Sequence, residues 1–253
     1  MCASHPREGT HPRKQSASSA RPWSTDQARV RQEHGVALIV ALMSMLLLVA
    51  LALSVTLTCV VESRIAASYA AGGEALYAAE AAAERVMADL SAIADWDRVL
   101  DGTVMADGTD VPTGTRELPD GSFVNVAQVT NELRCGRPTA CSDADVADMT
   151  SDRPWGLNNP RWQVYAAAPL HRLLSTDITE PFAYVVVWAG DDSGESDGNP
   201  LDDENGTILL IAHAYGLGGV RRAIEVAVAR ALAPESEGGG PVGIRLLSWR
   251  QVH

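Results

Sequence analysis

An uninterrupted run of uncharged, mostly apolar residues extends from Val36 to Val61 and holds 26 residues. A helix of that length spans roughly 39 Å, which exceeds the roughly 30 Å of a bilayer's hydrocarbon core. Arg21, Arg29 and Arg31 precede the run and acidic sequence follows it. This bias predicts a single-pass membrane helix with a cytoplasmic N-terminus and an exported C-terminal part.

Helical patterning continues from residue 62 to residue 97, where alanine dominates and proline is absent. Apolar side chains recur at mostly three-, four- or seven-residue offsets, which predicts an amphipathic stalk. The apolar set is Ile65, Tyr69, Leu76, Tyr77, Val86, Met87, Leu90 and Ile93. The set available for the wet side is Glu74, Glu80, Glu84, Arg85 and Asp89. Gly72 and Gly73 interrupt the pattern, so we expect a kink or a melted turn there.

The remaining sequence, residues 98–233, predicts an exported globular domain that ends in antiparallel sheet. Glycine and proline mark a loop-rich crossing over residues 101–121, alternation predicts a strand over 122–129, and 131–160 is expected to be irregular. Four runs of strand composition follow, and Gly216–Gly219 is expected to join the last two as a hairpin. These runs are 161–168, 182–189, 207–215 and 221–231. Together with the helix they predict an α+β fold.

The face that carries Ile224, Val226 and Val228 is expected to pack on the amphipathic helix. After it, residues 234–253 begin with a glycine-rich linker and are expected to form a flexible tail, in which residues 242–252 either add a short edge segment or stay loose.

Charge is distributed unevenly along the chain, whose net formal charge is −12. Residues 1–35 carry six basic and three acidic side chains, a sum of +3, which leaves −15 for residues 36–253. Nucleic-acid binding needs a basic patch, and the exported part offers none, so nucleic acid is excluded as an expected partner.

Four cysteines are present, and only Cys135 and Cys141 fall in the exported domain. An oxidising compartment favours a local disulfide between them, although two free thiols remain the alternative because spacing alone does not prove bond geometry.

Gly35, followed at once by the long apolar run and then by the alanine-rich stalk, resembles type IV pilin-like proteins. More narrowly, residues 35–42, 62–67 and 75–82 resemble the N-terminal region of PilX-type minor pilins, a similarity that covers about residues 31–90. The resemblance implies a pilin-like fold, with a long N-terminal helix packed on an antiparallel sheet. It also implies a leader, residues 1–35, that a prepilin peptidase cleaves after Gly35, and methylation of the new N-terminal residue Val36.

The sequence departs from major pilins at Val40, where most of them carry a glutamate that pairs with a neighbouring N-terminal amine. Its absence fits a low-copy or tip subunit. The resemblance thus implies a minor pilin that takes part in type IV pilus assembly or initiation by helix packing. Its implied partners are other pilin or pseudopilin subunits, the prepilin peptidase, the inner-membrane assembly platform and lipid. Its implied location is the bacterial inner membrane, with a periplasmic C-terminal domain, and later a filament at the cell surface.

An acidic segment between two predicted strands holds oxygen ligands that suit Ca²⁺: Asp191, Asp192, Glu195, Asp197, Asn199, Asp202 and Asp203. Gly194 and Gly198 would permit tight turns there, although the spacing is not that of an EF-hand loop. The calcium-binding pseudopilins lend this candidate support by analogy. A solvated acidic loop without a cation is the alternative.

Catalytic motifs are absent from the sequence. His171 and His213 are isolated, and neither Gly-x-Ser-x-Gly nor His-Glu-x-x-His occurs. We therefore expect no enzyme and no organic cofactor. Two other functions stay open: a tip pseudopilin of type II secretion, and a membrane-anchored periplasmic binding protein whose anchor is not cleaved.

Overall fold

The computed structural model describes residues 26–110, 114–118, 120–148, 156–176, 183–195, 197–232 and 241–252. The chain divides into two compact units, the first ending at Val61 and the second beginning at Glu62. Residues 1–25, most of the expected leader, lie outside the described residues. One helix, α1 (Asp26–Ala92), belongs to both units, and each unit is described by itself.

The α1 residues of the first unit expose every side chain from Val36 to Val61. Even Leu46 and Leu48 are 69% and 65% exposed. Three hydroxyls in this segment donate to carbonyls four residues earlier: Ser44 to Val40 at 2.8 Å, Thr56 to Ala52 at 2.9 Å and Thr58 to Ser54 at 3.0 Å. These hydroxyls are therefore satisfied within the helix, as an apolar environment requires. Its length and composition suffice for a membrane span, and an N-terminal targeting sequence would meet the same criterion.

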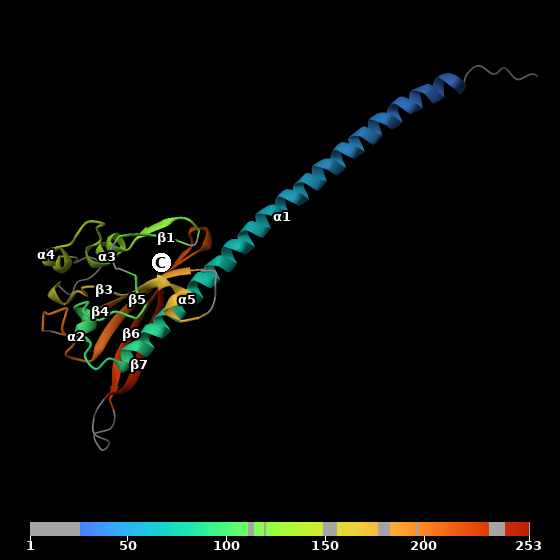
Figure 1. Ribbon diagram of the computed structural model, residues 1–253. Helices are drawn as coiled ribbons and strands as arrows, with labels where there is room; N and C mark the ends of the chain where they lie inside the picture. Colours follow the sequence, from blue (N-terminus) through green and yellow to red (C-terminus); the bar gives the residue numbers. More distant parts are fainter. Residues whose placement is uncertain are drawn as a thin grey trace, which may run out of the picture. The chain divides into compact units, whose positions relative to one another are not determined.

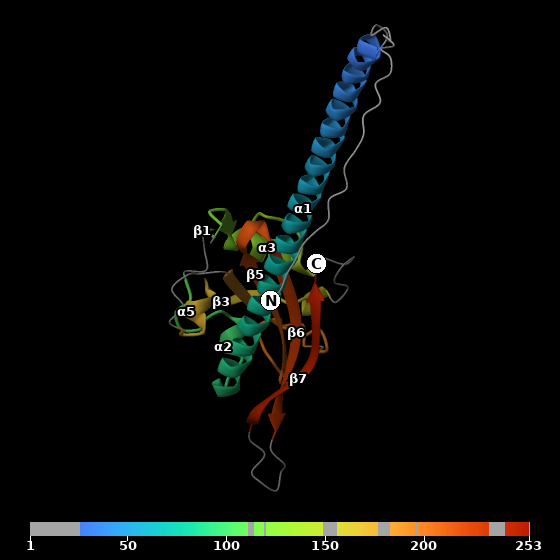
Figure 2. The same cartoon turned by 90° about the vertical axis from the view of Figure 1, so that its right-hand side faces the viewer.

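The second unit has an α+β layout in which α1 lies against a five-stranded antiparallel sheet of order β3-β4-β5-β6-β7 (Figures 1 and 2). The sheet strands are β3 (Gln163–Pro169), β4 (Ala183–Asp191), β5 (Thr207–Gly216), β6 (Arg221–Leu232) and β7 (Pro241–Val252). A small hairpin pairs β1 (Thr115–Glu117) with β2 (Phe123–Asn125). The short helices are α2 (Asp97–Leu100), α3 (Val126–Cys135), α4 (Asp143–Ala147), α5 (Leu170–Leu173), η1 (Gly156–Asn158) and η2 (Leu217–Gly219). The four strands expected in the C-terminal third are confirmed, with ends shifted by at most two residues.

Small side chains form most of the surface that α1 buries on the sheet. Ala78, Ala79, Ala82 and Ala83 are 0–1% exposed, and they share one core cluster with Val86, Leu90 and the β6 residues Ile224, Val226 and Val228. The expected packing of this β6 face on the helix is confirmed. Alanine removes little apolar area from water, but it lets a helix approach a sheet closely.

The expected composition of the buried helix face is partly wrong. Ile65, Tyr69 and Tyr77 were assigned to it, but they are 51%, 79% and 70% exposed. Because the contact is close, the helix turns its alanine stripe toward the sheet, and its large side chains at these three positions remain outside. α1 ends at Ala92, five residues before the expected end.

At Gly72 and Gly73, where a kink or a melted turn was expected, the helix is not interrupted, since both residues lie within the continuous α1. Gly72 is buried, and a Cβ placed there would come within 2.8 Å of Arg222 Nη2. This glycine therefore leaves room for a β6 side chain rather than bending the helix.

The expected strand over residues 122–129 is wrong in its second half, and the expected irregularity of 131–160 is wrong in part. The strand β2 ends at Asn125, whose side chain accepts a hydrogen bond from Gln128 N at 3.1 Å and caps α3. Asn is a favoured N-cap residue, and this local bond competes with continued strand pairing. A capping box between Ser142 and Asp145 similarly begins α4.

The flexible tail expected over residues 234–253 is corrected over residues 241–252, which form the edge strand β7 (Figure 2). Of the two alternatives for residues 242–252, the edge segment is therefore confirmed. It pairs antiparallel with β6, for example at Val226–Trp249, and Ile244 and Trp249 pack against the helix-side core. Pairing with β6 and these apolar contacts order the strand. The glycine-rich linker before it gives no sign of either in the sequence.

Candidate metal centre

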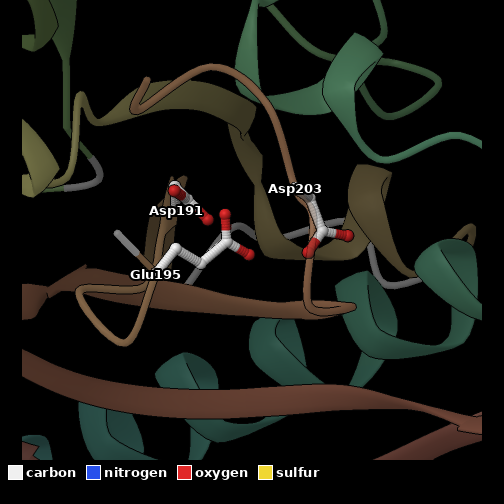
Figure 3. Close-up of side chains that lie close together, drawn as sticks. All are labelled: Asp191, Glu195 and Asp203. Carbon is white, nitrogen blue, oxygen red and sulfur yellow. The ribbon is translucent and has the colours of Figure 1, made fainter. Parts of the chain in front are cut away.

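Three carboxylates from the acidic segment converge at one end of the sheet (Figure 3). Asp191 is the last residue of β4, Glu195 lies in the following loop, and Asp203 precedes β5. Each offers an oxygen, and these oxygens all lie within 4.8 Å of one another. Asp191 and Glu195 are 1% and 8% exposed, and the side chain of Asp203 is 3% exposed.

Backbone amides hold two of these side chains in place. Glu195 accepts hydrogen bonds from Asn205 N at 2.7 Å and Glu204 N at 3.2 Å. Asp203 accepts from Gly206 N at 2.7 Å and Thr207 N at 3.0 Å, where the loop enters β5. The loop thus folds around its own carboxylates, and the antiparallel pairing of β4 with β5 brings its two ends together.

Burial of like charges dominates the electrostatics. Burial, followed by the charge of Glu195, raises the pKa of Asp191 to about 8. Burial also raises the pKa of Asp203, while hydrogen bonds from Gly206 and Thr207 and the charge of Arg230 oppose that rise. The group therefore gains from either a proton or a cation that offsets its negative charge.

Arg230 on β6 is the cation that the sequence did not associate with this group. Its Nε lies 3.7 Å from Asp203 Oδ2, its guanidinium stacks 4.1 Å from the Trp96 ring centroid, and its Nη1 donates to Ala94 O at 2.9 Å. It connects the carboxylates to the segment after α1. No local motif marks it, because it lies 27 residues after Asp203 in sequence and reaches the group only through strand pairing.

The chemistry of the donor set fits Ca²⁺. All three donors are carboxylate oxygens, and a spread of 4.8 Å is about twice the 2.3–2.6 Å length of a calcium–oxygen bond, so one ion could contact all three. Calcium takes about six to eight oxygens, and carbonyls or waters would have to supply the others. One cation would neutralise the repulsion between Asp191 and Glu195.

The other four expected ligands lie outside this group. Asp192 accepts hydrogen bonds from Gly194 N at 2.7 Å and Asn205 Nδ2 at 2.7 Å. Asn199 is exposed and accepts from Leu201 N, and Asp197 is exposed. The charge of Asp97 raises the pKa of Asp202, which groups that carboxyl with the α2 side of the loop. The structure thus brings together three of the seven expected ligands.

The other expected positions have simpler surroundings. The sulfurs of Cys135 and Cys141 are bonded to each other, and they join the end of α3 to the loop before α4. His213 is 5% exposed, and its ring stacks edge-on at 4.9 Å from Trp188. Gly35 and Val36 lie within α1.

Comparison with known proteins places the chain in no family: no protein-family model, no curated protein and no solved structure matches it.

Proposed function

We propose that this protein is a pilin-like minor subunit that is stored in the inner membrane by its N-terminal helix and takes part in filament assembly by helix packing. The observation that carries the proposal is the dual character of α1. Every side chain from Val36 to Val61 is exposed and uncharged, whereas the same helix between Ala75 and Leu90 is anchored on the sheet. An exposed apolar surface of this size requires lipid or other helices as its surroundings.

Small residues within the exposed segment support packing between helices. Small side chains allow helix backbones to approach closely in apolar surroundings. Six such residues lie among the larger ones of this segment: Ala37, Ala41, Ser44, Ala50, Ala52 and Ser54. Exchange of lipid contacts for helix contacts has little hydrophobic drive of its own, because both surfaces are apolar. Close packing and an assembly machine must therefore decide the outcome.

Processing after Gly35 is the step that the proposal makes testable. A Cβ added at Gly35 meets no atom within 4 Å, so a substitution there leaves the fold intact. Gly73 in the same helix is equally open and provides a matched control. We expect Gly35→Leu to block cleavage in the native host and Gly73→Leu to leave it unchanged.

N-terminal mass analysis of the mature protein gives the readout. Methylated Val36 as the first residue, lost in Gly35→Leu alone, supports a filament subunit. A mature-size product that persists in Gly35→Leu would mean that cleavage does not depend on Gly35, and it would reject the proposal. An uncleaved wild-type chain would reject it in favour of a permanently anchored binding protein. A type II secretion pseudopilin shares this processing, so deletion of the gene separates the two filament systems through loss of pili or loss of protein secretion.

A further inference from the structure

A surface hollow of about 200 Å³ lies between α3, β3 and the segment after α2, and none of its lining residues belongs to the three-carboxylate group. Ala127, Thr130, Asn131 and Arg134 line it from successive turns of α3, since they are spaced by three, one and three residues. Gln163 of β3 and Met105 complete the part used here. The disulfide at Cys135 fixes the end of α3 next to Arg134.

The guanidinium of Arg134 is part-buried and fixed without a carboxylate. Its Nε donates to Trp162 O at 2.7 Å, and its Nη2 donates to Gln163 Oε1 at 2.8 Å. Both acceptors are neutral, and no ion pair joins Arg134 to any of the described residues. Burial, together with the charge of Arg161, lowers the pKa of Arg134.

The hollow differs in charge from the rest of the exported part. Residues 36–253 carry a net charge of −15, yet none of the residues that line this hollow is acidic. A part-buried charge without a counterion is costly, and a ligand that brings the opposite charge offsets that cost. The amides of Asn131 and Gln163 add neutral donors beside the cation.

We propose that this hollow binds a singly charged carboxylate with a short aliphatic stem. A carboxylate matches the planar edge of a guanidinium and its single charge. The one cation and the neutral amides favour it over a doubly charged phosphate, and Met105 and Ala127 provide apolar contacts for the stem. The carboxylate belongs either to a free short-chain acid or to a Glu side chain of another polypeptide.

The test uses the full-length chain in a nonionic detergent, labelled with ¹⁵N-arginine, and follows the Arg134 Nε–Hε signal by NMR. Sodium butyrate is titrated against butyramide and sodium chloride at matched ionic strength. In parallel, acetyl-Ala-Glu-Ala-amide is compared with acetyl-Ala-Gln-Ala-amide. We expect saturation by a carboxylate with a Kd on the order of 1 mM, and no saturation by the neutral analogues or by chloride.

Two variants and one control locate the site; for all three, binding is followed by isothermal titration because Arg134→Gln removes the NMR probe. Arg134→Gln removes the cation, and Ala127→Leu fills the hollow while it leaves the Arg134 hydrogen bonds in place; each should weaken binding at least tenfold. Arg245→Gln removes an equal charge from β7, where Arg245 has no ion-pair partner among the described residues, and should leave affinity unchanged.

Saturation by butyrate assigns a free acid, and saturation by the Glu peptide alone assigns a polypeptide side chain; both support the site. Equal binding of butyramide, unchanged affinity in both variants, or no saturation by either carboxylate would overturn it.

Discussion

The two faces of the five-stranded sheet are covered by different chemistry. On the α1 side the core is almost wholly aliphatic, with alanines from α1 facing residues such as Val185, Leu210 and Val226. On the α3 side it is aromatic and partly polar: Trp188 Nε1 donates to Thr130 Oγ1 at 2.8 Å, and His213 and Tyr215 lie in the layer. A close aliphatic contact therefore stabilises the α1 side of the sheet, and a contact that includes hydrogen bonds stabilises the α3 side.

The difference also separates the titrating groups. His213 lies within the α3-side layer, whereas Asp191 lies at the end of β4 and continues the α1-side series of Val185, Val187 and Ala189. One face therefore has a buried imidazole in its middle, and the other has a buried carboxyl group where the sheet ends. Each face should respond to substitution and to pH in its own way.

Removal of a large side chain from the α1-side core should have the greatest effect. Leu90 is 1% exposed, and Leu90→Ala should lower the free energy of unfolding by about 2–5 kcal/mol, independently of pH. Leu47→Ala removes the same atoms from a residue that is 62% exposed in the apolar segment, and should leave the unfolding midpoint unchanged. Denaturant titration in detergent, followed by fluorescence of the buried tryptophans, gives both values. Equal losses would contradict the assignment of the α1-side core.

Calcium should stabilise the end of the α1-side face. At 100 times its Kd it would add about 2.7 kcal/mol to the free energy of unfolding. The folded-state pKa of Asp191 is raised to about 8. Without calcium, the proton on Asp191 therefore stabilises the folded state; this stabilisation is fully present below about pH 4 and is lost as pH rises to about 8. Calcium favours the ionised form, so its binding should release protons and tighten as pH rises from 6 to 8.

Asp191→Asn should abolish the calcium effect, and Asp197→Asn, which changes an exposed carboxyl outside the group, should preserve it. Isothermal titration in buffers of different ionisation enthalpy measures the released protons. Absence of heat with millimolar Ca²⁺ would reject the cation and leave a proton as the neutralising partner.

An enlarged side chain should test the closeness of the α1 contact. Ala79 is fully buried, and Ala79→Leu should cost about 1–3 kcal/mol through overpacking. Ala88→Leu places the same side chain on the exposed side of α1 and should change stability by less than about 0.5 kcal/mol. Thermal unfolding of the two variants in detergent measures the contrast. If Ala79→Leu were as stable as wild type, the helix would not lie close to the sheet.

The sequence predicted the elements whose signal is local and strong. The membrane-type helix, the four strands and the face of Ile224, Val226 and Val228 follow from composition and period. The buried face of α1 did not, because alanine carries a weak hydrophobic signal while Tyr69 and Tyr77 carry a strong one, and only the tertiary contact determines which packs. For β7 the sequence left an edge segment and a loose stretch as alternatives, because the strand follows a glycine-rich linker.

The candidate site divides in the same manner. Asp191, Glu195 and Asp203 lie in one segment, so composition identified them together with four neighbours that the fold places elsewhere. Composition could not select among the seven. The selection depends on the end of β4, which places Asp191, and on the backbone amides of residues 204–207, which bind Glu195 and Asp203. Arg230 and the Arg134 hollow depend on strand pairing and on the turn of α3, and neither leaves a local pattern.

The α3-side face should respond to acid in the opposite sense to Asp191. Burial, and to a lesser extent the charge of Arg221, lowers the pKa of His213 from its ordinary 6.5 to about 3. The unfolded chain therefore binds a proton below about pH 6.5 that the folded chain does not bind, and stability falls as pH decreases toward 3. The loss is about 1.4 kcal/mol per pH unit, or about 2 kcal/mol at pH 5.

The variant His213→Phe keeps an aromatic ring beside Trp188 but cannot titrate. Between pH 7 and pH 5, the free energy of unfolding of this variant should therefore fall by less than that of the wild type. Parallel denaturant titrations at the two pH values isolate the difference, because the carboxylates titrate alike in both proteins. Identical pH dependence of the two proteins would mean that His213 takes up its proton in the folded state, and the α3-side layer would then be open to water.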